Sequence, residues 1–165
     1  MPTGLLLKQS HDGTVITLEL AGPMNESSDY PSIDTPDIKT LTIDFRGITL
    51  INSIGIQKWV EFLRGVPVEV DIIFQHCTLR VVNQINLFPG FTGSRSVRIT
   101  SFFAPYYCDR CDTSVSILLE CLGKLGTDPG TQKLPAQRCS RCEGMLDFDG
   151  IEEKYFLFLK RFSVA

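Results

Sequence analysis

The chain has 165 residues, of which 43% are hydrophobic and 21% are charged, and its formal net charge at pH 7 is -3. This apolar fraction is typical of a packed core and excludes a disordered chain, and the length suits one domain or a compact domain with a small module. The acidic balance disfavours a general role in binding nucleic acids or anionic membranes. No export signal is visible, and no stretch reaches the roughly 18 apolar residues of a membrane span, so we expect a cytoplasmic protein.

The first hundred residues alternate between strand-like and helix-like patterns. The strands expected from β-branched, alternating segments are residues 14–20, 41–45, 68–74 and 96–103, the last closed by Pro105. The helices expected from apolar residues at three- and four-residue spacing are 52–63 and 79–87. Residues 25–37 are expected to form a loop or a poorly defined helical turn. Trp59, the sole tryptophan, falls on the apolar face of the first helix and is expected in the core. These elements predict an α/β fold in which helices cover a small sheet.

The remaining residues have a different character, because five of the six cysteines lie after residue 107. In a chain without an export signal, metal binding or redox chemistry explains such cysteines better than disulfides do. The chain then ends in an aromatic segment over 152–162. The residues of this segment that share one helical face are Tyr155, Phe156, Leu159 and Phe162. We expect a terminal helix docked on the first domain, although periodicity alone leaves a buried strand open.

Two CxxC turns carry the clearest chemical signal, Cys108-Asp109-Arg110-Cys111 and Cys139-Ser140-Arg141-Cys142. Each turn aims two sulfurs at one point, and together they supply the tetrahedral Cys₄ shell that Zn²⁺ prefers. We expect one structural Zn²⁺ in a zinc ribbon, with residues 144–148 pairing back against the segment before Cys139. A closed shell leaves no open position for catalysis.

Other uses of these cysteines remain open. An iron–sulfur cluster also takes four thiolates, and a redox-sensing site or a pair of disulfides are further alternatives. Cys77 and Cys121 are expected to be small buried residues outside the site. His11 and His76 lie in no supporting pattern and are assigned ordinary structural or surface roles.

The stretch LTIDFRGITLINSIGIQKWVEFL (residues 41–63) runs from a buried strand through a turn into the first helix. It resembles the STAS domain of anti-sigma-factor antagonists, in which a strand ending near an Asp leads to a Gly-containing turn. An Asp-Ser-Ser/Thr-Gly motif then opens a helix. The resemblance covers about residues 5–104, so we expect a STAS-like domain over residues 1–104. A Cys₄ zinc ribbon with a C-terminal helix is expected over 105–165.

In that family the first serine of the motif is phosphorylated by a partner anti-sigma factor with serine kinase activity, which disrupts the complex. The resemblance places this role on Ser53 and the partner-binding surface on Asn52, Ser53, Ile54 and Gly55. Asn52 stands where the family has Asp, and Ile54 stands where it often has Ser or Thr. A phosphate at a helix N-terminus adds about -1.5 to -2 charge beside the positive end of the helix dipole. It would therefore change the charge of the partner-binding surface.

We therefore expect a non-enzymatic bacterial regulator that binds a protein partner, with homo-oligomerisation left open. No catalytic pattern supports an enzyme, because Ser53 has no histidine near it in the sequence. The alternative function is nucleic-acid binding by the ribbon. Its candidate basic residues, interleaved with acidic ones, are Arg110, Lys133, Arg138 and Arg141, beside Asp109, Asp112 and Glu143.

Overall fold

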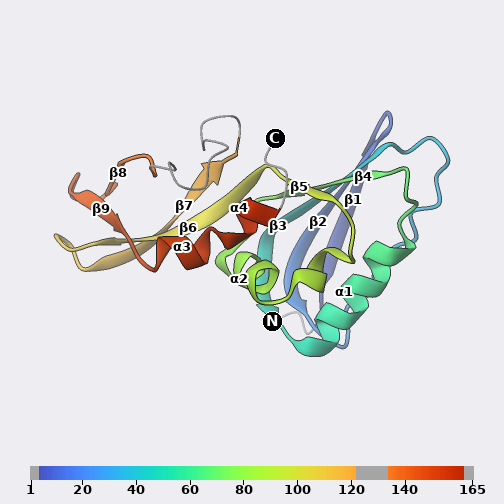
Figure 1. Cartoon of the computed structure of the whole chain (residues 1–165), viewed down its shortest axis with the longest axis horizontal. Coiled ribbons are helices and arrows are strands. Elements are labelled where there is room, and N and C mark those ends of the chain that lie inside the picture. Colours follow the sequence, from blue (N-terminus) through green and yellow to red (C-terminus); the bar gives the residue numbers. More distant parts are fainter. Residues whose placement is uncertain (1–3, 122–133, 162–165) are drawn as a thin grey trace.

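The protein consists of two β-sheets with helices packed against them (Figure 1). The computed structural model describes residues 4–121 and 134–161. Within that part of the chain the architecture is mixed α/β, as the sequence predicted. No helix there is long and apolar enough to cross a bilayer.

The first sheet has five strands in the order of the sequence. These strands are β1 (Leu6–Asp12), β2 (Val15–Met24), β3 (Thr40–Ile51), β4 (Asp71–Gln75) and β5 (Val97–Ile99). β1 and β2 are antiparallel and turn at Gly13, whose φ of 57° favours glycine, whereas the other neighbours are parallel. Of the two readings of residues 25–37, the loop is present, because no helix or strand lies between β2 and β3.

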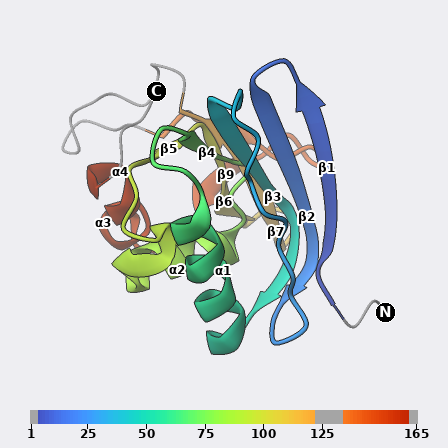
Figure 2. The same ribbon diagram turned by 90° about the vertical axis from the view of Figure 1, so that its right-hand side faces the viewer.

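One face of this sheet is covered by α1 (Ser53–Gly65) and α2 (Leu79–Leu87), as Figure 2 shows. Alternate residues of β3, among them Leu41, Ile43 and Phe45, are fully buried. Trp59 is also fully buried, and its indole Nε1 donates a hydrogen bond to the Phe91 carbonyl at 2.8 Å. The short 3₁₀ helix η1 (Pro89–Thr92) carries Phe91. The expected place of Trp59 in the core is confirmed.

The second sheet has four antiparallel strands in the order β7-β6-β9-β8. They are β6 (Ser101–Cys108), β7 (Thr113–Glu120), β8 (Gln137–Arg138) and β9 (Met145–Phe148). β6 and β7 form a long hairpin that extends away from the first sheet (Figure 1). β9 pairs with β8 just before Cys139, which confirms the pairing expected for residues 144–148.

The expectation of one strand over 96–103 closed by Pro105 is wrong. β5 ends at Ile99 in the first sheet, and β6 begins at Ser101 in the second and continues through Pro105. Proline lacks an N–H donor, which usually excludes it from a central strand. Here β9 pairs with Tyr106 and Tyr107 of β6 but not with Pro105. On that side of β6, therefore, no ladder hydrogen bond from the nitrogen of residue 105 is needed.

The two sheets meet where the chain leaves β4. Cys77 forms a parallel bridge with Phe102 of β6, and its N–H donates to the Ser101 carbonyl at 3.1 Å. The preceding residue, His76, has a positive φ of 49°. The buried side chains of both sheets belong to one continuous hydrophobic cluster.

The C-terminal segment is helical but interrupted. In place of one helix over 152–162, the structure has α3 (Glu152–Tyr155) and α4 (Leu157–Arg161), which break at Phe156, and Phe162 lies outside the described residues. Asn86 of α2 donates its amide to the Tyr155 carbonyl at 2.8 Å, and the Tyr155 hydroxyl donates to the Phe103 carbonyl. The expected docking against the first hundred residues is confirmed, since α2 is a helix of that part.

Candidate functional site

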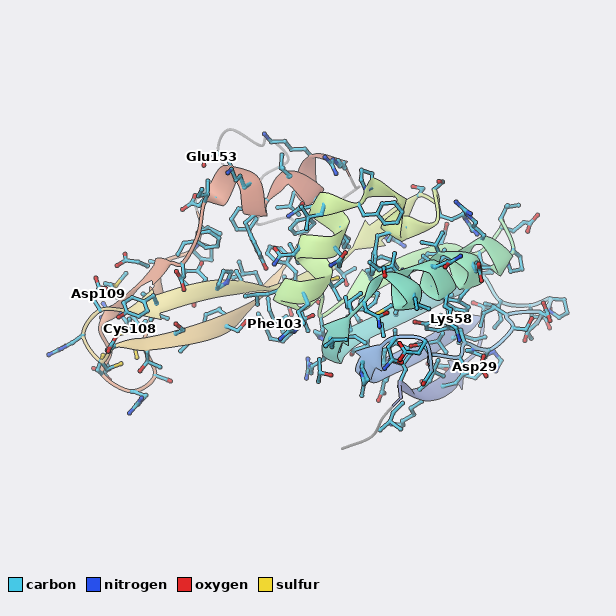
Figure 3. The ribbon with its side chains drawn as sticks, turned by 90° about the horizontal axis from the view of Figure 1, so that it is seen from below. Asp29, Lys58, Phe103, Cys108, Asp109 and Glu153 are labelled. Carbon is cyan, nitrogen blue, oxygen red and sulfur yellow. The ribbon has the colours of Figure 1, made fainter. Side chains whose placement is uncertain are left out.

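Four cysteines meet at the far end of the β6–β7 hairpin, near Cys108 in Figure 3. Cys108 ends β6 and Cys111 lies in the turn before β7, whereas Cys139 follows β8 and Cys142 lies in the turn before β9. Their four sulfur atoms all lie within 4.8 Å of one another. The two turns are far apart in the sequence, and the pairing of β6 with β9 brings them together.

The sulfur geometry fits a metal shell. The Sγ atoms of Cys108 and Cys142 are 3.4 Å apart, and those of Cys111 and Cys139 are 3.5 Å apart. A disulfide requires about 2.05 Å, so these are free thiols. Four sulfurs arranged tetrahedrally at about 2.3 Å from a zinc ion lie about 3.8 Å from one another. The cluster can therefore hold a metal ion such as zinc.

The two turns share a backbone conformation. The residue after each second cysteine has a positive φ, 50° at Asp112 and 58° at Glu143. In the second turn, the backbone N–H groups of Arg141 and Cys142 lower the pKa of the Cys139 thiol to about 6. At Cys111 the hydrogen bond from Thr113 lowers the pKa, but neighbouring thiols outweigh it and the pKa is raised to about 11. Metal binding would remove the proton from all four thiols.

The arginines beside the cluster donate hydrogen bonds to residues of the same two cysteine turns and the strands next to them. Arg110 donates to the Cys142 carbonyl at 3.3 Å, and Arg141 donates to the Thr113 hydroxyl at 3.2 Å, so each reaches the opposite turn. Arg138 donates to the Glu143 carbonyl at 3.2 Å. Lys133, the fourth candidate for nucleic-acid binding, lies outside the described residues.

The other two cysteines lie in the core, as expected. Cys77 is fully buried and Cys121 is 1% exposed, and neither belongs to the four-cysteine cluster. Burial raises the pKa of both thiols, to about 12 for Cys121. They are therefore protonated at neutral pH and are poor metal ligands in this state.

The second predicted site lies at the start of α1. Asn52 is the N-cap, because its Oδ1 accepts a hydrogen bond from the Gly55 N–H at 2.8 Å. Its Nδ2 donates to Glu26 at 3.1 Å. Ser53 and Ile54 are exposed, whereas Gly55 is buried. The four residues thus form one corner, in which Ser53 and Ile54 present side chains to solvent and Gly55 shapes the backbone.

One polar cluster was missed at the sequence level. His76 Nδ1 lies 2.7 Å from Asp44 Oδ2, although the two residues are 32 positions apart in the chain. A partial signal existed, because Asp44 lies near the end of the predicted strand 41–45 and His76 follows the next predicted strand, 68–74. The carboxyl ends of neighbouring parallel strands meet at one edge of a sheet.

Comparison with models of known protein families and with curated protein sequences found no match for this chain.

Proposed function

We propose that this chain is a non-enzymatic regulatory module that binds a partner protein through the corner at Asn52–Gly55, in the manner of an anti-sigma-factor antagonist. The observation that carries the proposal is the exposure of Ser53 and Ile54 in the first turn of α1. The sequence resemblance of residues 41–63 to STAS domains supports it. So does the element order, in which β3 leads directly into α1 and α1 into β4.

The corner has the properties of a protein-binding surface. Ile54 is 48% exposed and Leu50, near the end of β3, is 47% exposed, so two large apolar side chains lie on either side of Ser53 in the sequence. Exposed apolar side chains of this size favour contact with another protein over contact with a nucleic acid. The cap by Asn52 holds the backbone of this turn in a fixed conformation before any partner binds.

A phosphate on Ser53 would change this surface sharply. It would add about -1.5 to -2 charge next to the exposed Ile54. Glu26, which contacts the neighbouring Asn52, adds a second negative group. Its hydrogen bond with its own backbone and that from Asn52 lower its pKa, so it is ionised at neutral pH. Phosphorylation would therefore weaken an apolar contact here. In anti-sigma-factor antagonists, phosphorylation of the matching serine likewise disrupts the complex.

In this proposal the ribbon holds one structural Zn²⁺ on Cys108, Cys111, Cys139 and Cys142. Its arginines argue against the nucleic-acid alternative, because Arg110, Arg138 and Arg141 each donate to an atom of the ribbon. A guanidinium that is already engaged has fewer donors left for a phosphate backbone.

The test is affinity capture from a lysate of the source organism. We expect a partner that binds the wild-type protein and Ser53→Ala, and is lost with Ser53→Asp and Ile54→Asp. Ser114→Asp is the matched control, since Ser114 is an exposed serine on β7. Equal capture by wild type and Ser53→Asp would contradict the switch. Native mass spectrometry of the protein from its host would show phosphate on Ser53 directly.

A further inference from the structure

The face of the first sheet opposite α1 and α2 contains a cleft of about 410 Å³. Residues of β2 and β3 line it, together with His76 at the end of β4. Asp44 and Arg46 alternate along β3 with the buried Ile43 and Phe45, so the side chains that β3 adds to this face at the cleft are charged. The cleft is separate from both the cysteine cluster and the corner at the start of α1.

A β-bulge shapes the cleft. Glu19 of β2 pairs with Asp44 and Ala21 pairs with Gly47, so two residues of β3 lie opposite Leu20 alone. Gly47 permits this close approach, because a Cβ there would lie 2.6 Å from the Ala21 Cβ and 2.7 Å from the Leu20 carbonyl oxygen. Bulges of this kind redirect side chains and are frequent beside binding and active sites.

Asp44 organises the polar groups of the cleft. Its Oδ1 accepts from the Arg46 backbone N–H at 2.9 Å, and its Oδ2 accepts from Gln75 Nε2 at 3.1 Å and contacts His76 Nδ1 at 2.7 Å. Three donors therefore satisfy this carboxylate. The contact at Nδ1 fixes the imidazole, and Nε2 makes no hydrogen bond within the described residues.

The junction of the two sheets holds His76 in place. Its φ of 49° is unusual for a residue with a side chain, and strained backbone of this kind persists where the surrounding structure enforces it. Here the His76 N–H donates to the hydroxyl of the buried Ser101 at 2.8 Å. Two interactions therefore hold the histidine in position, the bond of its backbone N–H to Ser101 and the contact of its ring with Asp44.

Of the charged side chains that line the cleft, Glu19, Asp44 and Arg46, only the arginine lacks a side-chain partner within the described residues. Glu19 pairs with Lys8 at 3.4 Å, and Asp44 is satisfied as described. Arg46 is exposed at the cleft, and its guanidinium has no hydrogen bond or ion pair among residues 4–121 and 134–161. We propose that this cleft binds the phosphate or carboxylate group of a small ligand, with the Arg46 guanidinium as the main donor. Because His76 Nδ1 already faces Asp44, Nε2 donates to the ligand as well when the imidazole carries a proton on both nitrogens. A planar guanidinium suits either oxyanion, because it can donate two parallel hydrogen bonds.

The test is an NMR titration of the ¹⁵N-labelled full chain with inorganic phosphate, and separately with acetate, at constant ionic strength. We expect saturable shifts of the Arg46, Gly47 and His76 signals, and at least about fivefold weaker binding in Arg46→Gln and His76→Gln, for the loss of one charged hydrogen bond. The probe that binds more tightly identifies the phosphate or the carboxylate as the preferred group.

Arg80→Gln is the matched control, because Arg80 is an exposed arginine on α2, on the covered side of the sheet. Arg46→Gln decides the outcome if His76→Gln fails to fold, since the Arg46 guanidinium has no hydrogen bond or ion pair to lose within the described residues. Shifts that do not saturate, or equal weakening by Arg80→Gln and Arg46→Gln, would overturn the proposal.

Discussion

Gly55 packs so closely against Met24 that a Cβ at this position would lie 2.1 Å from the Met24 carbonyl oxygen. The contact joins the start of α1 to the end of β2, and Asn52 reinforces it by donating its own N–H to the same carbonyl at 3.0 Å. The proposed binding corner is therefore held against the sheet by backbone atoms.

Gly55→Ala should destabilise the protein by about 2–3 kcal/mol, because the added methyl group meets backbone that cannot move freely. Gly65→Ala is the control in the same helix, since a Cβ at Gly65 meets nothing within 4 Å. It should be neutral or stabilise by a few tenths of a kcal/mol through helix propensity. Urea denaturation of both variants measures the difference. Similar midpoints for the two would show that the Gly55 contact is not tight.

The four-cysteine cluster predicts the metal content of the protein. The protein purified from its host should carry one metal ion per chain, and Cys142→Ser should lose it, because a closed four-thiolate shell does not tolerate loss of a ligand. Cys121→Ala should keep the ion, since Cys121 is buried in the core outside the cluster. Inductively coupled plasma mass spectrometry measures metal content and separates zinc from iron. Equal metal loss in both variants would contradict the assignment of the ligands.

Arg95 gives a prediction about stability. Its guanidinium donates to four carbonyls around the end of α1, at Leu63, Val66, Pro67 and Val70, at distances of 3.4, 2.6, 3.0 and 3.1 Å. Arg95→Lys should cost about 2 kcal/mol, because one ammonium cannot replace this planar set of donors. Arg98→Lys, at an exposed position of β5, should cost nothing measurable. Thermal unfolding monitored by circular dichroism compares the two. An unchanged midpoint for Arg95→Lys would show that these bonds contribute little.

The ribbon arginines allow a test against nucleic-acid binding. Arg110→Ala and Arg141→Ala should lower the thermal stability of the protein, because each removes a hydrogen bond between the segments that carry the two cysteine turns. Neither should change retention on DNA or RNA, which we expect to be weak at physiological salt. A salt-dependent affinity that both substitutions abolish would instead favour the nucleic-acid function.

The sequence predicted elements wherever one face of an element is buried. α1 was recognised because Trp59 and Leu63 repeat at helical spacing, and both are fully buried. β1 was missed because it is an edge strand whose residues are nearly all exposed, so no alternation marks it. The cysteine cluster could be predicted because chemistry dictates its spacing. The sequence could place Asp44 and His76 near one edge of the sheet, but it could not predict their contact, which depends on the register of β3 with β4 and on the backbone turn at His76.

Phe158 provides the last prediction, because it attaches the C-terminal segment to the rest of the protein. Its ring is fully buried and packs edge to face on Phe102 of β6, with the ring centroids 5.0 Å apart. Phe158→Ala should destabilise the protein by about 3–5 kcal/mol, the usual range for removing a buried phenylalanine.

Leu87→Ala is the control, since Leu87 is 79% exposed at the end of α2. Urea denaturation followed by Trp59 fluorescence measures both variants. Trp59 lies in the first sheet's core, so a lower midpoint for Phe158→Ala by this probe would show that the C-terminal helices stabilise that core. An unchanged midpoint would show that α4 docks without contributing to it.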